Sequence, residues 1–225
     1  RQVTRIVTPG TLTDAALLDE RRDNVLLAVL PARARIGLAW LSLASGAFRV
    51  LETAAASLSS ELTRLAPSEI LVPEGLESAV PDTGPAPRRR LPDWHFDEQS
   101  AQRTLTEQFR TKDLAGFGAE DLGPALGAAG ALLQYARSTQ AAAMAHVTGL
   151  TVERTDAYVT LDAATRRNLE ISETLRGEPA PTLLSTLDTC VTSMGSRLMR
   201  HWLHHPLRDR QVLRARLAAV GSLLD

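Results

Sequence analysis

The sequence predicts an α/β fold followed by an all-α segment, that is, a mixed sheet with flanking helices and then a run of helices. Apolar runs of strand length, joined by short turns, dominate the first half of the chain. Beyond Asp162 the apolar positions recur with a period near 3.6 instead of two. We therefore divide the chain into residues 1–20, the tail of a preceding domain and a linker, residues 21–144, an α/β domain, and residues 145–225, the start of a helical domain.

The first 20 residues show weak local signals. Residues 1–8 alternate between polar and apolar side chains, and Pro9-Gly10 is typical of a turn that ends such a segment. Thr13-Asp14 can cap a brief helix that extends through Leu18. The charged residues 19–23 then indicate an exposed linker.

The α/β domain begins with three strands. Residues 25–30, 35–43 and 47–51 are apolar runs joined by short turns, which predicts an antiparallel meander. Residues 54–65 have leucines spaced for one face of an amphipathic helix, and residues 69–73 read as a further buried strand. A meander followed by a helix and another strand predicts a mixed sheet.

A segment rich in Pro, Gly and charge, residues 73–92, follows the fourth strand. It contains Arg88-Arg89-Arg90, which could grip phosphate, but no aromatic residues are interleaved with these arginines. We therefore expect a mobile, solvated loop. Trp94 and Phe96 are expected to return to the core.

Two helices are expected to complete the α/β domain. Residues 100–109 place Leu105 and Phe109 on one face, so that Gln102, Arg103 and Glu107 should point outward. Pro124 opens a second helix that runs to about Thr139 and presents several glycines and alanines. Interior glycines cost a helix about 1 kcal/mol each, so this face should pack closely against the sheet.

The strand-to-helix corner lies near Asp162. Residues 150–153 and 158–161 alternate and predict a pair of short strands, and Asp162 has the acceptor side chain of a helix N-cap. Three helices should follow, at residues 181–188, 194–204 and 210–224. The last carries an apolar stripe that we expect to remain exposed for neighbouring helices to cover.

Several motifs, in the same order, resemble the DNA mismatch repair protein MutS where its connector domain joins its core. The similarity extends over almost the whole chain, which makes chance agreement improbable although each motif alone is weak. The matching motifs are residues 5–11, 116–118, 128–135 with 139–140, 162–170, 182–184 with 187–188, 194–198 and 202–207.

The resemblance implies a connector of ribonuclease H-like fold, followed by the first helices of the MutS core or lever domain. In that family the connector couples mismatch recognition to the ATPase, and its outer surface docks MutL after ATP binding. The helix that matches the docking segment carries Gln102, Arg103 and Thr104, our candidate partner-binding residues. Some relatives have paired glutamines at the last two positions, so the docking position carries over but the individual contacts do not.

Other activities are expected in the full-length parent. The resemblance implies that the full-length protein binds ATP and magnesium, forms a homodimer and contacts mismatched DNA. The present sequence has no P-loop of the Gly-x-x-x-x-Gly-Lys-Ser/Thr type. We expect no enzyme activity, no catalytic or metal-ligating residue and no cofactor in the segment itself.

Composition supports a non-catalytic interpretation. A net charge of −1 and a pI near 6.6 give no global attraction to nucleic acid. The single cysteine, Cys190, excludes an intrachain disulfide and suits a reducing cytosol; we expect it to be a small buried side chain. No apolar run reaches the length of a membrane span, so the chain should be soluble, cytoplasmic and without a membrane partner.

The main alternative is a resolvase-like, metal-dependent nuclease built on the same fold. True nucleases of this fold hold metal ions with carboxylates, but Ser42 stands where many MutS relatives have Asp, at a position we assign to an outer face of the sheet. Asp162 and Glu170 form the nearest carboxylate pair. Eight residues along a helix separate them by about 12 Å, too far to share one metal.

Two smaller alternatives concern the helical segment. His201, His204 and His205 could bind a metal, although histidines at the end of a helix more often interact with its free carbonyl groups. Residues 194–224 could form a DNA-binding helix-turn-helix, but the connection lacks the usual glycine.

Overall fold

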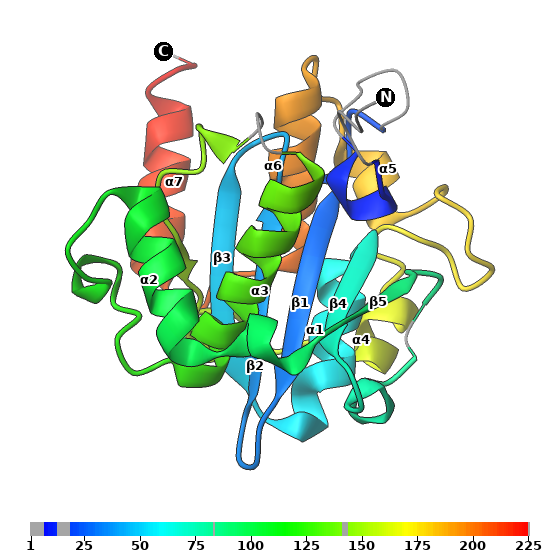
Figure 1. The fold of residues 1–225 in the computed structure, drawn as a ribbon. Coiled ribbons are helices and arrows are strands. Elements are labelled where there is room, and N and C mark those ends of the chain that lie inside the picture. The colour runs from blue at the N-terminus through cyan, green and yellow to red at the C-terminus, as the bar shows by residue number, and fades with distance from the viewer. Residues whose placement is uncertain (1–6, 13–18, 83, 141–143, 225) are drawn as a thin grey trace, which may run out of the picture. The chain divides into compact units, whose positions relative to one another are not determined.

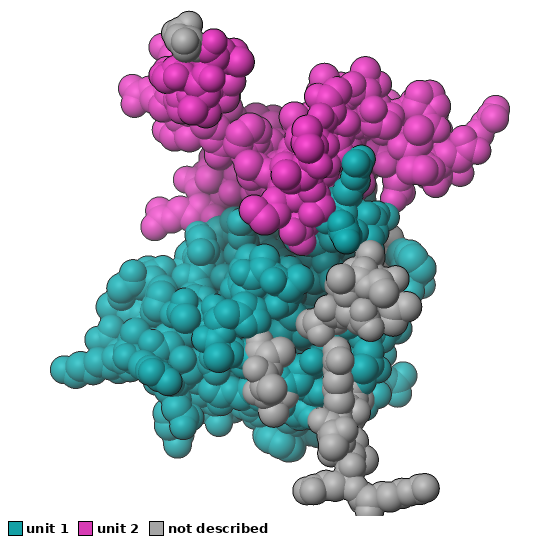
Figure 2. Space-filling view, turned by 90° about the horizontal axis from the view of Figure 1, so that it is seen from above, with its two compact units in different colours: residues 1–153 teal, residues 154–225 magenta. Residues whose placement is uncertain are grey.

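The computed structural model describes most of the chain as two compact units. Unit 1 is Arg1–Glu153 and unit 2 is Arg154–Asp225, shown in different colours in Figure 2. The described residues are 7–12, 19–82, 84–140 and 144–224.

Two expectations fall outside this range in whole or in part. The helix expected over residues 13–18 and most of the alternating segment over residues 1–8 lie outside the described residues. Pro9–Thr11 is described and forms a 3-10 turn, as its Pro-Gly pair predicts. The division of the sequence into domains at residue 144 stays a prediction.

Unit 1 is built on one mixed sheet. In the part of the chain that the structure describes, six strands pair in the order β5-β4-β1-β2-β3-β6 (Figure 1). The predicted meander is confirmed, because β2 pairs antiparallel with both β1 and β3. β4 and β5 add in parallel beyond β1, and β6 adds in parallel to β3. The strands are β1 (Val25–Pro31), β2 (Ile36–Ser42), β3 (Ala47–Thr53), β4 (Glu69–Pro73), β5 (Arg88–Leu91) and β6 (Thr151–Val152).

Helices cover both faces of this sheet (Figure 1). The helices that cover it all belong to unit 1 and are α1 (Leu58–Leu65), α2 (Glu98–Phe109) and α3 (Gly123–Thr139). Unit 2 is described by itself and contains α4 (Ala163–Asn168), α5 (Leu183–Leu187), α6 (Ser193–His204) and α7 (Arg210–Gly221). The prediction of an α/β fold followed by helices is confirmed. In the described residues, no helix is both long and apolar enough to span a membrane.

Strand β1 shows why the sheet buries both faces. Its side chains alternate, so Leu26 and Ala28 join the core beneath α2 and α3, whereas Leu27 and Val29 join the core beneath α1. All four are fully buried. The near-continuous apolar run that predicts this strand is therefore the pattern of a strand buried on both sides.

Helix α3 lies unusually close to its neighbours, as its small residues predict. A Cβ atom on Gly37 of β2 would lie 2.1 Å from the carbonyl carbon of Pro124. A Cβ atom on Gly130 would lie 2.4 Å from the Cβ atom of Ala101 in α2. Glycine thus allows close contact of α3 with the sheet and also with α2, which the sequence pattern did not predict.

Two expectations for residues 73–96 are wrong. Arg88–Leu91 forms edge strand β5 rather than a loop; the Ile70 amide donates to the carbonyl of Pro87 at 3.0 Å. The sequence pattern did not predict this strand because an edge strand can keep charged side chains in solvent, so its arginines look like those of a loop. Phe96 is buried as expected, but Trp94 is 66% exposed and stacks on His95 in a 3-10 turn, with ring centroids 3.8 Å apart.

The corner after residue 150 differs from the predicted strand pair. β6 pairs with β3, and Tyr158 forms an isolated bridge with Leu207. A 3-10 turn at Thr155–Ala157 separates the two segments, so they pair with other parts of the chain and not with each other. The predicted cap is confirmed, because Asp162 accepts a hydrogen bond from the Thr165 amide at 2.6 Å.

Unit 2 contains the three helices predicted after the corner, as α5, α6 and α7. The apolar stripe of the last one is exposed, as expected: Leu217 is 72% exposed and Val220 is 50% exposed.

Candidate functional site

Helix α2 presents the residues that the sequence resemblance singles out. Asp97 caps it by accepting a hydrogen bond from the Ser100 amide at 2.8 Å. Gln102 and Arg103 are exposed, and Thr104 is half-buried with its hydroxyl donating to the Ser100 carbonyl at 2.8 Å. The structure therefore places Gln102 and Arg103 on an outer surface, whereas the Thr104 hydroxyl is engaged within the helix. Whether these residues bind a partner stays a prediction.

Gln108, which sequence reasoning missed, secures the second half of α2. Its side-chain amide donates to the carbonyls of Met144 at 2.8 Å and Val147 at 3.0 Å. Its carbonyl accepts from the guanidinium of Arg137 in α3 at 2.7 Å. Because one side chain joins two helices and a loop, the outer face of α2 is held firmly.

A buried carboxylate at the start of β4 binds the segment that precedes the sheet. Glu69 is 4% exposed. Its Oε2 accepts hydrogen bonds from the Thr8 hydroxyl at 2.5 Å and from the Gly10 amide at 3.0 Å, and its Oε1 accepts from the Tyr135 hydroxyl at 2.7 Å. Burial, together with the neighbouring Glu69 carboxylate, raises the pKa of Tyr135, although the Thr8 hydrogen bond opposes this.

Two amide side chains complete this group. Asn24 donates to the carbonyls of Pro9 at 2.9 Å and Leu12 at 3.0 Å. Gln140 donates to the carbonyl of Thr11 at 2.7 Å. We call Glu69, Tyr135, Asn24 and Gln140 the Glu69 clamp. Only the charge that opens an otherwise apolar strand at residue 69 could have signalled it from the sequence.

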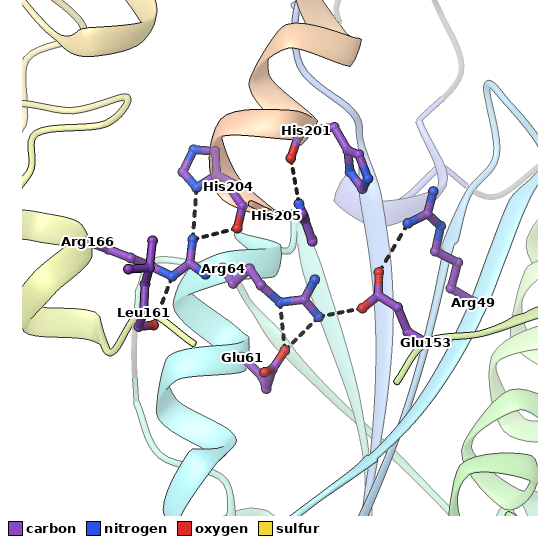
Figure 3. Close-up of polar contacts among 9 residues, drawn as sticks. All are labelled: Arg49, Glu61, Arg64, Glu153, Leu161, Arg166, His201, His204 and His205. Carbon is purple, nitrogen blue, oxygen red and sulfur yellow. Dashed lines mark hydrogen bonds and ion pairs between the residues drawn. The ribbon is translucent and has the colours of Figure 1, made fainter. Parts of the chain in front are cut away.

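A second buried carboxylate belongs to Glu153, the last residue of unit 1 in the sequence, and Figure 3 shows its contacts. It accepts from the guanidinium groups of Arg64 at 2.8 Å and Arg49 at 3.1 Å. Arg64 also pairs with Glu61 at 2.6 Å and lies over the ring of Trp40 at 5.6 Å. Burial disfavours the charged form of Arg64, but Glu153 and then Glu61 outweigh it and raise its pKa. We call this group the Glu153 clamp.

Within unit 2, Arg166 joins the corner to the end of α6 (Figure 3). Its Nε donates to the carbonyl of Leu161 at 3.2 Å, and its Nη1 donates to the carbonyl of His204 at 2.9 Å. The residue is 8% exposed. Arg166 therefore satisfies the carbonyl of His204, the last residue of α6, and also the carbonyl of Leu161 in the corner before α4.

The histidines at the end of α6 are engaged in local contacts. His205 Nδ1 donates to the carbonyl of His201 at 2.8 Å, which confirms the expected interaction with the helix end. His204 Nε2 lies 3.0 Å from the Ser172 hydroxyl. Among the described residues, no group of three or more His, Cys, Asp or Glu side chains is arranged to hold a metal ion.

The carboxylates considered for a nuclease are also engaged with backbone. Asp162 caps α4, and this hydrogen bonding lowers its pKa. Glu170 lies beyond the end of α4 and accepts from the Leu175 amide at 2.7 Å. The separation of about 12 Å assumed that Asp162 and Glu170 lie on one helix. They do not, because α4 ends at Asn168.

Two expected positions are corrected. Ser42 is 5% exposed and therefore does not lie on an outer face, because β2 is a central strand covered on both sides. Cys190 is half-buried rather than buried, because it lies in the connection between α5 and α6.

The family comparison agrees with this architecture. Residues 24–148 match the model of MutS domain II, and residues 164–225 match the model of MutS domain III. The first match covers most of the sheet unit and more than half of the chain. The sequence contains one lysine, Lys112, which follows Thr111, so the Gly-Lys pair of a P-loop is missing from it. The chain thus belongs to the MutS family, as connector and core sequence of a mismatch repair protein.

Proposed function

We propose that this segment couples mismatch recognition to the ATPase of the complete protein and that α2 docks MutL. The exposure of Gln102 and Arg103 carries the docking proposal, because the opposite face of the same helix is anchored by fully buried Ala101 and Leu105. A surface that projects polar side chains from a rigid element suits recognition of a partner. The resemblance to MutS supports the choice of MutL.

Coupling is supported by the two clamps. Glu69 fixes the segment at residues 8–12, and Glu153 fixes the last residues of unit 1 through Arg64 and Arg49. A displacement of the chain at either position would therefore be transmitted to the closely packed sheet, because hydrogen bonds and ion pairs fix both positions to it.

The other activities are proposed for the complete protein. ATP and magnesium would bind to its ATPase, and mismatched DNA would bind to its recognition domain. The complete protein would be a homodimer. We also propose a cytoplasmic location, which the membership in the MutS family and the single cysteine support, because free thiols persist in a reducing compartment.

Calorimetry tests the docking proposal. The chain is titrated into the N-terminal half of MutL, and Arg103→Glu is compared with Arg33→Glu, which reverses an exposed charge in the β1–β2 turn. We expect saturable binding that Arg103→Glu weakens about tenfold, because a reversed charge at an interface costs on the order of 1–2 kcal/mol. Equal binding by both variants, or no binding at all, would contradict docking through α2 by this segment.

A resolvase-like nuclease is the second candidate, and the contacts of its nearest carboxylate pair do not favour it. Asp162 and Glu170 both accept hydrogen bonds from backbone amides close to them in sequence. Magnesium-dependent DNA cleavage that Asp162→Ala abolishes would reverse this preference, whereas Asp162→Asn serves as the control that retains a helix cap.

A further inference from the structure

We propose that the Glu69 clamp is a binding site for a Thr-Pro-Gly-Thr peptide, filled by the chain's own Thr8–Thr11, and that movement of the preceding chain reaches the sheet through it. The site lies at the amino-terminal ends of the parallel strands β1 and β4, because Glu69 opens β4 and pairs with Leu26 of β1. It is formed wholly by unit 1.

The donors and acceptors of the site match those of the peptide in order. The Glu69 carboxylate accepts from the Thr8 hydroxyl and from the Gly10 amide. The side-chain amides of Asn24 and Gln140 then donate to the carbonyls of Pro9 and Thr11, and Asn24 also donates to the carbonyl of Leu12, which follows the peptide. Because both side-chain amides donate to main-chain carbonyls, the site recognises the backbone conformation of the peptide as well as the hydroxyl of Thr8.

The shape of the site requires glycine at the third peptide position. A Cβ atom on Gly10 would lie 2.7 Å from Leu26 Cδ1 and 2.8 Å from Glu69 Cβ. Real Cβ atoms do not approach other atoms this closely, so any larger residue must displace either the peptide or the side chains of the site.

The peptide is also organised for binding by its own residues. Proline at position 9 starts the 3-10 turn, where its missing amide hydrogen is not needed. The Thr8 amide donates to the Thr11 hydroxyl at 3.1 Å, and the Thr11 amide donates to the Thr8 carbonyl at 3.1 Å. A ligand that is already folded loses little conformational freedom on binding.

The burial of Glu69 separates this site from an ordinary surface contact. A carboxylate that is 4% exposed must have its charge satisfied by hydrogen bonds, and Thr8 and Gly10 supply two of the three that are observed. Release of the peptide would leave Oε2 without these donors. The peptide is therefore expected to stay bound to the site in the folded chain.

Hydrogen exchange in the full chain tests the site. Gly10→Ala is compared with Gly116→Ala, a control position where an added Cβ has nothing within 4 Å. We expect the amides of residues 10 and 11 to exchange about 10–100-fold faster in Gly10→Ala, as for loss of charge-assisted hydrogen bonds, whereas amides of β1 and β2 keep their protection. A second variant, Thr8→Val, removes one hydroxyl without adding volume and should have a smaller effect in the same direction.

Two outcomes would overturn the binding site. Unchanged exchange at residues 10 and 11 would mean that the clamp does not hold the peptide. Loss of protection throughout β1 and β2 would mean that the peptide is part of the core rather than a ligand of it. Neither outcome depends on MutL, so failure of docking and failure of the site can be told apart.

The mechanical part of the proposal rests on the proposed coupling role and has its own readout. A nitroxide at Val7→Cys, in a chain that also carries Cys190→Ser, reports on a residue that is 53% exposed beside the clamp. We expect an immobilised spectrum that becomes mobile in Gly10→Ala and does not change in Gly116→Ala. A mobile spectrum without either glycine substitution would show that the site does not restrain the preceding chain.

Discussion

The two units of the chain bury apolar side chains to very different extents. The largest side chains with less than 2% exposure, which include Leu27, Leu38 and Leu132, all belong to unit 1. Among the described residues of unit 2, the buried hydrophobic side chains are Ile171 and Leu184. Unit 1 is thus stabilised by a core on each face of its sheet, and unit 2 is not.

Exposed apolar side chains show the reverse distribution. In the described part of unit 1, the large hydrophobic residues that are exposed are Val7, Leu76 and Trp94. Unit 2 exposes many more, including Leu217 at 72% and Val191 at 100%. Its order depends more on polar contacts, such as the N-caps at Asp162, Thr182, Thr192 and Asp209 and the bridge made by Arg166. The helices of unit 1 are therefore held mainly by burial, whereas those of unit 2 depend more on caps and other polar contacts.

Truncation of a leucine in each unit should give the largest contrast. Leu132→Ala in α3 removes a fully buried side chain, and we expect it to lower the free energy of unfolding by about 2–5 kcal/mol. Leu217→Ala in α7 should change it by less than about 0.5 kcal/mol, because that side chain buries little. Urea denaturation followed by circular dichroism measures both. A larger loss for Leu217→Ala would show that α7 has a core contact in solution.

Removal of the Arg166 bridge should affect unit 2 alone. Arg166→Met leaves the carbonyls of Leu161 and His204 without their donor, which should destabilise the corner and α6 by about 1–3 kcal/mol. Arg167→Met is the matched control, since the guanidinium of Arg167 donates an exposed hydrogen bond, to the carbonyl of Leu175 at 3.3 Å. Site-resolved amide exchange in α4 and α6 measures the effect. Equal exchange in the two variants would contradict a structural role for Arg166.

The smallest effect concerns the Asp162 cap and is a pH dependence. Backbone hydrogen bonds lower the pKa of Asp162 in the folded chain. The cap therefore contributes stability above the pKa of an unfolded Asp, and that stability is lost as the pH falls through the folded value. Acid titration of α4 by NMR should show this loss in the parent chain. Asp162→Asn caps without titrating, so a similar acid transition in that variant would contradict this explanation.

Much of the fold could be predicted because its signals are local. Apolar periodicity located β1 to β4 and the helices of both units, and Asp162 marked the start of α4. β5 was missed because arginines on an edge strand resemble a solvated loop. The Glu69 clamp was also missed, because Glu69 meets partners 59 to 66 positions away in the sequence. Such pairings arise from the topology of the sheet and leave no spacing pattern.

We infer that the sheet unit folds as a complete unit and can act as a rigid connector, whereas the helices after residue 153 are held by local contacts. Native-state hydrogen exchange over the whole chain tests this claim most directly. We predict that amides of β1, β2 and α3 exchange only through global unfolding of unit 1, whereas those of α6 and α7 exchange through smaller openings. Equal protection in the two units, lost together at one denaturant concentration, would contradict it.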